Sequence, residues 1–104
     1  MGRKPLHPNI DDLDLASVLN ALSDPIRLDI VYHLSKKGSS SCMGSCPEIS
    51  KSTVSHHFRI LRESGLIRSE KEGVTLVNTL RKEELNKKFP GLLDLILKLY
   101  QKTH

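Results

Sequence analysis

Two cysteines are the residues of this sequence best suited to reactive chemistry. Cys42 and Cys46 are the only cysteines among 104 residues, and they stand four positions apart. On a helix, residues with this spacing share a face, with Cα atoms roughly 6 Å apart, which a disulfide can span. Three interpretations stay open: a thiol pair that senses oxidation, a soft-metal or metalloid site, and two small buried side chains. We favour oxidation to a disulfide, because a thiolate at a helix N-terminus would be reactive and a second thiol stands near it.

A second group of side chains has the chemistry to bind a polyanion. Within residues 51–63, Val54, Phe58 and Leu61 recur at helical spacing, so one face of a predicted helix is apolar. Short hydroxyls on the other faces would let the helix backbone approach phosphates, which Lys and Arg would neutralise. An ordinary amphipathic surface helix is the alternative. The polar positions that we expect to face DNA are Lys51, Ser52, Ser55, His56, Arg59 and Arg62.

The charge and length of the chain limit the classes of protein that it can belong to. Residues 9–34 carry a charge of −4, residues 51–88 carry +4, and the whole chain carries +4. This uneven distribution indicates a polyanion-binding face. No apolar run exceeds three residues, so we expect no membrane span, no secretory signal and a soluble cytoplasmic protein. The length supports one domain over residues 1–104.

The order of the predicted elements is that of a winged helix-turn-helix. We expect a mainly α fold with a small β-hairpin, in the order α-α-α-α-β-β-α. Asp24 and Pro25 predict the start of a helix, and Gly38 predicts its end. A basic hairpin beside the helix at 51–63 could reach the neighbouring DNA backbone. We expect a flexible arm at 1–10 and a loop at 39–41. The expected helices are at 12–22, 25–37, around 42–46, 51–63 and 82–102, and Pro90 and Gly91 could kink the last one. The expected strands are at 66–71 and 74–80.

These segments resemble the ArsR/SmtB family of bacterial repressors. Residues 21–30, 52–58 and 61–67 look like that family's second helix, recognition helix and helix-to-wing junction, and Glu72-Gly73 falls at its wing tip. The resemblance covers about residues 12–80. It implies a homodimeric repressor that leaves its operator DNA when an inducer binds. It also implies DNA contacts by Ser52, Thr53, Ser55 and His56. We add Lys71 of the hairpin to these contacts and expect a packing or buried hydrogen-bonding role for His57.

The patterns of the family's metal sites are not matched in this sequence. One of them needs a Cys-x-Cys pair followed by another cysteine, whereas this chain has Cys-x-x-x-Cys. The other uses Asp, His and Glu on the last helix, where Asp94 and His104 stand without paired partners. We therefore expect no metal site on the last helix and no cofactor. A small-molecule inducer is a further alternative if the cysteines are inert.

Other function classes find less support in the sequence. No Ser-His-Asp order in a suitable turn context, no phosphate-cradling glycine loop and no pair of acids in an apolar setting is present, so we expect no enzyme. Cys42 with His56 or His57 could mimic a nucleophile and its base, but both histidines stand on the predicted DNA helix. A winged helix can also serve as a protein-interaction module, which the basic residues within 51–71 argue against.

The last helix indicates a homodimer. Apolar residues point nearly all round it between residues 92 and 100, and a helix that is apolar on two sides needs a second partner. In a short chain that partner is most simply another copy, and the first helix can pack beside the last one. The predicted dimer residues are Leu15, Leu19, Leu92, Leu93, Ile96 and Tyr100.

Overall fold

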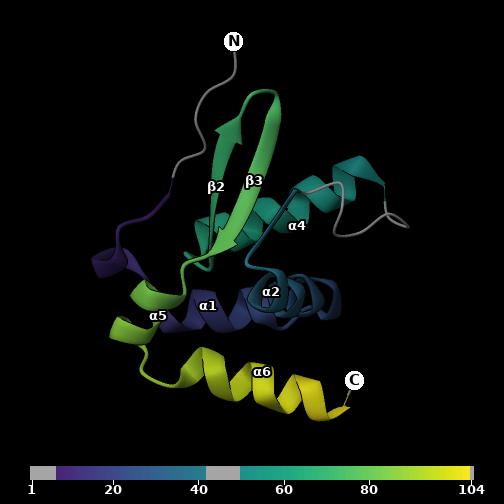
Figure 1. The fold of residues 1–104 in the computed structure, drawn as a ribbon. Coiled ribbons are helices and arrows are strands. Elements are labelled where there is room, and N and C mark those ends of the chain that lie inside the picture. The colour runs from purple at the N-terminus through teal and green to yellow at the C-terminus, as the bar shows by residue number, and fades with distance from the viewer. Residues whose placement is uncertain (1–6, 42–49, 104) are drawn as a thin grey trace.

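Three helices begin where the sequence offers a capping side chain. In the computed structural model, which describes residues 7–41 and 50–103, Asp14 accepts a hydrogen bond from the backbone N–H of Ser17. Asp24 accepts from the N–H groups of Ile26 and Arg27, and Ser50 from that of Thr53. These bonds satisfy N–H groups that lack partners in the first helical turn. They define the starts of α1 (Leu15–Leu22), α2 (Pro25–Lys37) and α4 (Lys51–Glu63) (Figure 1).

A three-stranded antiparallel sheet carries the wing. Strand β2 (Ile67–Glu72) pairs with β3 (Thr75–Leu80) through the turn at Gly73, where φ is 64° and glycine is favoured. The predicted hairpin is thereby confirmed. Strand β1 (Ser39–Ser41) pairs with the other side of β3, so the strand order is β1-β3-β2. The prediction of a loop at residues 39–41 is wrong, because this strand depends on pairing with a segment almost 40 positions later rather than on its own composition.

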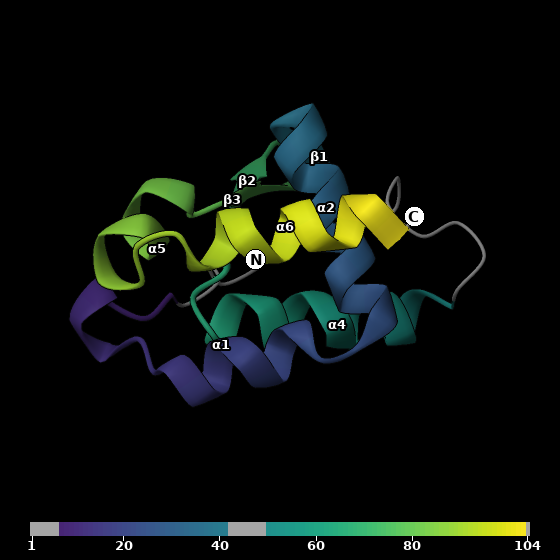
Figure 2. The ribbon, with the colours of Figure 1, turned by 90° about the horizontal axis from the view of Figure 1, so that it is seen from below.

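The C-terminal segment forms two helices instead of one. Helix α5 (Lys82–Lys88) ends before Pro90, and α6 (Leu92–Thr103) starts after Gly91, whose φ is 78°. The break falls where the sequence suggests a kink, since proline cannot continue the hydrogen-bond ladder and glycine accepts the left-handed conformation. Figure 2 shows α6 running across α2, and the Tyr100 hydroxyl donates to Asp29 of α2 at 2.6 Å. The ring of Tyr100 lies 5.0 Å from that of Tyr32.

The N-terminal part of the described chain packs against the wing and α5. The predicted helix at 12–22 is shorter than expected, because α1 starts at Leu15 and a separate 3₁₀ turn, η1, covers Ile10–Asp12. The backbone N–H of Ser69 donates to His7 Nε2 at 2.9 Å, and Arg81 donates to the carbonyl of Pro8 at 2.8 Å. The described residues of the predicted arm are therefore held in place, in contrast to the expected flexibility.

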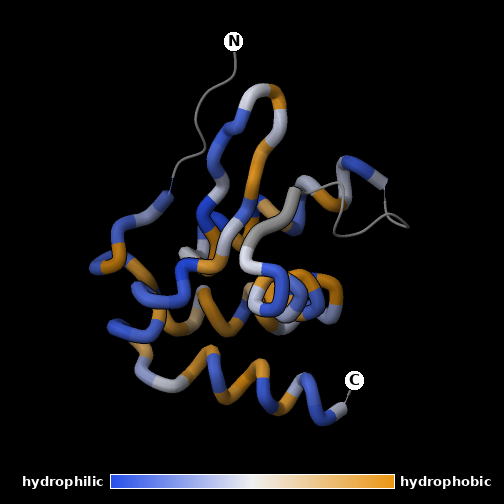
Figure 3. The backbone as a smooth tube through the Cα atoms, in the orientation of Figure 1, coloured by the Kyte–Doolittle hydropathy of each residue, from blue (hydrophilic) through white to orange (hydrophobic). Residues whose placement is uncertain are grey.

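The core joins α1, α2, α4 and the wing. Phe58 and Leu61 of α4 are fully buried, as are Leu66 and Ile67 at the start of the wing. In Figure 3, hydrophobic and hydrophilic residues alternate along α6, which faces the core on one side only. Among the described residues no helix is long and apolar enough to cross a membrane.

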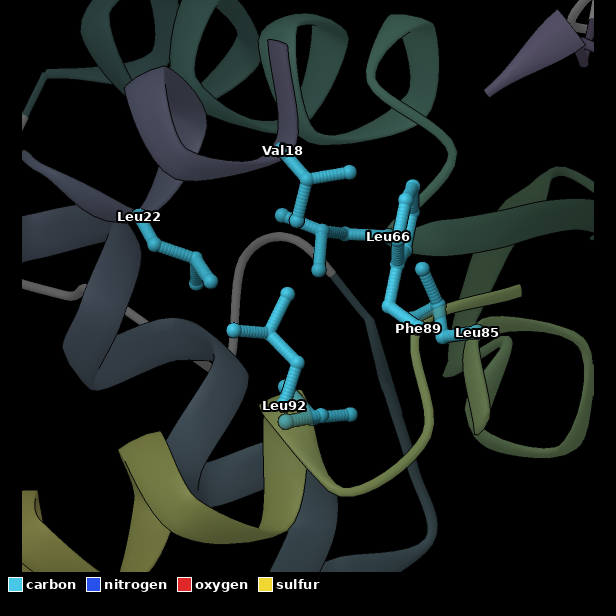
Figure 4. A pocket seen from close by; sticks show the side chains of 7 residues that line it. Val18, Leu22, Leu66, Leu85, Phe89 and Leu92 are labelled. Carbon is cyan, nitrogen blue, oxygen red and sulfur yellow. The ribbon is translucent and has the colours of Figure 1, made fainter. Parts of the chain in front are cut away.

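An apolar cluster fills the space where α1, α5 and α6 meet (Figure 4). The cavity that it leaves has a volume of only about 10 Å³, which is far below the several hundred Å³ typical of a small-molecule site. This cavity is therefore a packing gap and no site for an inducer. Its lining residues are Val18, Leu22, Leu66, Leu85, Phe89, Leu92 and Leu93.

Candidate nucleic-acid interface

Helix α4 has one buried face and one exposed polar face. Val54, His57, Phe58 and Leu61 are buried, which confirms the apolar face predicted from the spacing and adds a histidine to it. Six of the seven residues predicted to face DNA from this helix are exposed, and Arg62 is half-buried. The exposed six are Lys51, Ser52, Thr53, Ser55, His56 and Arg59.

Some of these polar groups already have partners within the protein. The Ser50 hydroxyl donates to Thr53 Oγ1 at 2.9 Å, so the Thr53 side chain is held at the N-terminus of α4. Arg59 Nε lies 3.3 Å from Glu63 Oε2, and both side chains are well exposed. Such an exposed pair contributes little and can open to a phosphate. Arg62 reaches the Ser69 hydroxyl of β2 at 3.5 Å and so joins α4 to the base of the wing.

The wing is less basic than expected from the sequence. Strand β2 carries Arg68 and Lys71 but also Glu70 and Glu72, and β3 carries no charged residue. The hairpin is therefore neutral overall, and the expectation of a basic wing is wrong. Lys71 is exposed near the tip, and Val74 beside the turn is 99% exposed. The cations that the two wing strands carry are therefore Arg68 and Lys71.

A charged cluster fixes the base of the wing to α5. Arg81 is 5% exposed and donates to both carboxylate oxygens of Glu84, at 3.0 and 2.9 Å. Arg68 also reaches Glu84, at 3.3 Å. The hydrogen bonds from Arg81 are the main reason that the pKa of Glu84 falls to about 2. This cluster links β2 and the end of β3 to the first turn of α5. The sequence does not predict it, because its residues are polar and follow no periodic pattern.

His57 has the buried hydrogen-bonding role expected from the sequence. It is 7% exposed, and its Nδ1 atom lies 3.2 Å from Arg27 Nη1. Asp24 Oδ2 lies 3.9 Å from the same atom. Burial is the main cause that lowers the pKa of His57; Asp24 opposes this shift, whereas Arg27 and His56 add to it. His57 thus connects α4 to the start of α2 and lies off the exposed polar face of α4.

The candidate sensor residues fall outside the described part of the chain. Cys42 and Cys46, and the short helix predicted around them, lie among residues 42–49, and His104 is also not described. Within residues 7–41 and 50–103, no group of three or more His, Cys, Asp or Glu side chains is arranged to hold a metal.

The predicted dimer residues divide into buried and exposed ones. Leu93 and Tyr100 are 7% and 8% exposed and pack within the protomer, while Leu92 and Ile96 are half-buried. Leu15 and Leu19 on α1 are each 45% exposed. Leu95 and Leu99 on α6 are 55% and 53% exposed, and the sequence does not single them out because apolar residues surround most of this helix. Helices α1 and α6 both lie away from the wing (Figures 1 and 2).

The fold and the exposed face of α4 define the chain as a winged helix-turn-helix protein, and comparison with known proteins gives its family. Residues 24–69 match the model of the arsR family of bacterial regulatory proteins. The chain is 37% identical over 87 residues to the HTH-type transcriptional regulator YceK of Bacillus subtilis strain 168, covering 81% of this chain and 87% of YceK. It is 36% identical over 77 residues to the arsenical resistance operon repressor of the same organism, covering 71% of this chain and 69% of the repressor.

Solved structures agree with these sequence relatives. HlyU from Vibrio cholerae matches with a TM-score of 0.68 and 29% identity, over 82% of this chain and 89% of HlyU. The homodimeric winged helix-turn-helix domain of Mb0332 from Mycobacterium bovis matches with a TM-score of 0.67 and 21% identity, over 86% of this chain and 83% of that one. The chain belongs to the ArsR family of DNA-binding transcriptional regulators.

Proposed function

We propose that this protein is a homodimeric repressor that reads its operator with α4 and leaves the operator when an inducing signal arrives. The observation that carries the proposal is the division of α4 into a buried apolar face and an exposed face of hydroxyl, imidazole and cationic groups. A helix of this kind fits the major groove, where such groups can contact base edges and phosphates. A regulatory role of this kind needs no enzymatic step, and we propose none.

Each exposed group of α4 has a role that its chemistry favours. Lys51 and Arg59 neutralise phosphates, and Arg62 does so from the junction with the wing. Ser55 and His56 have donors and acceptors suited to base edges. Ser52 and Thr53, beside the helix N-terminus, suit phosphate oxygens. Lys71 reaches the backbone from the wing.

The proposed dimer uses the exposed leucines of α1 and α6. Leu15 and Leu19 are one helical turn apart, and so are Leu95 and Leu99. Exposed leucines on two helices that both lie away from the wing offer apolar surface that a second copy can cover. The homodimeric state of the similar Mb0332 domain supports this proposal. A dimer also presents two copies of α4 to the two halves of an operator.

The inducing signal that we propose is oxidation of Cys42 and Cys46 to a disulfide. The four-residue spacing supports it, and Cys42 directly follows strand β1, which pairs with the wing strand β3. Release by a soft metal or metalloid is the alternative, supported by the similarity to an arsenical resistance operon repressor. A small molecule bound between the two protomers is a further alternative if the cysteines are inert.

Binding to a DNA duplex selected from a random library by the wild-type chain tests these roles. Lys51→Ala and Arg59→Ala should weaken binding and flatten its salt dependence by close to one unit of slope for each phosphate that is no longer neutralised. Ser55→Ala and His56→Ala should change the preferred sequence, and Lys98→Ala on α6 is the control that should change neither. If all four α4 variants bind as the wild type does, α4 is not the reading helix.

The same duplex distinguishes the three signals. A protein with both cysteines replaced by serine should keep its DNA affinity under peroxide, whereas the wild type should lose it. Release of the wild type by arsenite under strong reductant, with no response to peroxide, would establish the metalloid alternative. If wild type and double variant respond alike to both treatments, the inducer does not act through the thiols.

A further inference from the structure

Three helices meet at the guanidinium of Arg27. This residue lies in the first turn of α2, and its Nε donates to the carbonyl of Ala21 at 2.7 Å. Its Nη2 donates to the carbonyl of Asn20 at 3.3 Å. Both carbonyls belong to the last turn of α1, which has no basic residue of its own. Arg27 therefore supplies the positive charge and the donors that the C-terminus of α1 needs.

The remaining branch of the same guanidinium reaches α4. Arg27 Nη1 lies 3.2 Å from Nδ1 of His57. A guanidinium can only donate, so Nδ1 must accept, and the imidazole is neutral with its proton on Nε2. His57 stands between the exposed His56 and the fully buried Phe58. The bond thus fixes α4 at the edge between its proposed DNA face and its core face.

A second partner for His57 stands beside the first. Asp24 Oδ2 caps α2 by accepting from the N–H groups of Ile26 and Arg27, and it lies 3.9 Å from His57 Nδ1. The charged and titratable groups that face His57 are Asp24 and Arg27 from α2 and His56 from α4. A protonated His57 would carry a proton on Nδ1 and could no longer accept from Arg27. Its nearest acceptor would be Asp24.

We propose that Arg27 is a positioning residue that holds α4 in the orientation for DNA binding through its hydrogen bond to a neutral His57. When His57 is protonated, its Nδ1 loses the bond from Arg27 and donates to Asp24 instead, and DNA binding weakens. The inference rests on the proposed role of α4 as the reading helix. The proton comes from solvent, and no other group need change its charge. Arg27 also donates to the carbonyls of Ala21 and Asn20 at the end of α1. Loss of its bond to His57 would therefore remove a contact between α2 and α4 but leave the contacts between α1 and α2 in place.

Variants of His57 separate this positioning role from simple packing. His57→Asn keeps an oxygen acceptor near the place of Nδ1 but does not titrate, whereas His57→Leu fills the space without an acceptor. At about pH 7.5, His57→Leu and Arg27→Lys should each bind the selected duplex about tenfold more weakly, which is about 1.4 kcal/mol. His57→Asn should restore most of the affinity that His57→Leu loses.

The dependence on pH is the decisive readout. From about pH 7.5 to about pH 5.5, the wild type should lose affinity relative to His57→Asn, because only the wild type can protonate residue 57. His33→Asn is the matched control: it makes the same replacement at an exposed histidine of α2, and its pH profile should follow the wild type. Thermal melting of every variant at both pH values shows whether the folded chain is being measured.

Two results would overturn the inference. One is a pH profile of His57→Asn that is identical to that of the wild type. The other is that His57→Leu and Arg27→Lys both bind the duplex as tightly as the wild type does, while Lys51→Ala and Arg59→Ala still weaken binding. In that case α4 is the reading helix, but Arg27 does not position it. If Lys51→Ala and Arg59→Ala also have no effect, the proposed role of α4 itself has failed.

Discussion

At the scale of single residues, contacts between distant segments shift the pKa of Tyr100 and of His7. Tyr100 on α6 donates to Asp29 on α2, and this bond is the main cause that raises the pKa of Tyr100 to about 12. His7 accepts from Ser69, and burial together with the nearby Arg68, Arg81 and Arg62 lowers the pKa of His7. Neither effect is visible in the sequence, because each pair is more than 60 positions apart.

Tyr100 gives the first prediction at this scale. The unfolded chain loses the phenolic proton near pH 10, whereas the folded chain retains it until about pH 12. The folded state therefore loses stability as the pH rises through this interval. Tyr100→Phe should remove the tyrosinate absorbance step near pH 12 and lower the free energy of unfolding at neutral pH by about 1 kcal/mol. An unchanged absorbance titration in Tyr100→Phe would contradict the assignment.

His7 gives a second prediction, with the opposite dependence on pH. Its pKa is below the ordinary value of 6.5 in the folded chain, so the unfolded chain binds the proton first as the pH falls. The free energy of unfolding should therefore decrease below about pH 6.5. His7→Gln, which places an amide oxygen near Nε2 and does not titrate, should reduce this decrease in urea unfolding measured at several pH values. Equal pH dependence in both proteins would show that His7 is not responsible.

At the scale of elements, local signals in the sequence predict α2, α4 and the wing hairpin well. Asp24, Pro25 and Gly38 delimit α2 because capping and backbone preference act within a few residues. The same local rules cannot predict β1, which needs β3, or the meeting of Arg27 with His57, which are 30 positions apart. The candidate DNA face follows from helical periodicity alone, whereas the joints that orient it depend on tertiary packing.

The junction between α4 and β2 provides a prediction about packing. Gly65 has a φ of 88°, and a Cβ atom there would collide with the side chain of Leu13. Gly91 has a similar φ of 78° but nothing within 4 Å of the place of a Cβ atom. Gly91→Ala should cost only the backbone strain of about 1–2 kcal/mol. Gly65→Ala should cost clearly more in thermal or urea unfolding, and equal losses would show that Leu13 moves aside freely.

The caps of α1 and α2 provide another prediction. Asp14 and Asp24 both cap helices, and Asp24 also faces His57. Asp14→Ala should lower the free energy of unfolding by about 1 kcal/mol, as an ordinary N-cap does. Asp24→Ala should cost at least as much and should also lower the pKa of His57 further, because the nearby negative charge is removed. Chemical unfolding with an NMR titration of His57 measures both effects.

At the scale of the whole molecule, the exposed leucines predict the state of assembly. Leu95→Glu with Leu99→Glu should give a folded monomer, because these side chains are more than half exposed in the protomer. Leu93→Glu is the contrasting variant and should unfold the chain, since Leu93 is 7% exposed. Sedimentation and circular dichroism together distinguish these results. A wild-type chain that sediments as a monomer at micromolar concentration would contradict the proposed dimer.

The bond between His7 and Ser69 also bears on the behaviour of the protein in concentrated solution. Strand β2 is an outer strand of the sheet, and an outer strand offers free backbone groups to which a strand of another molecule can add. His7 occupies the N–H of Ser69, and Pro8 is held beside it by Arg81. This short segment therefore covers part of the outer edge of β2, and we expect a chain shortened to begin after Pro8 to add strands of other molecules at that edge more readily.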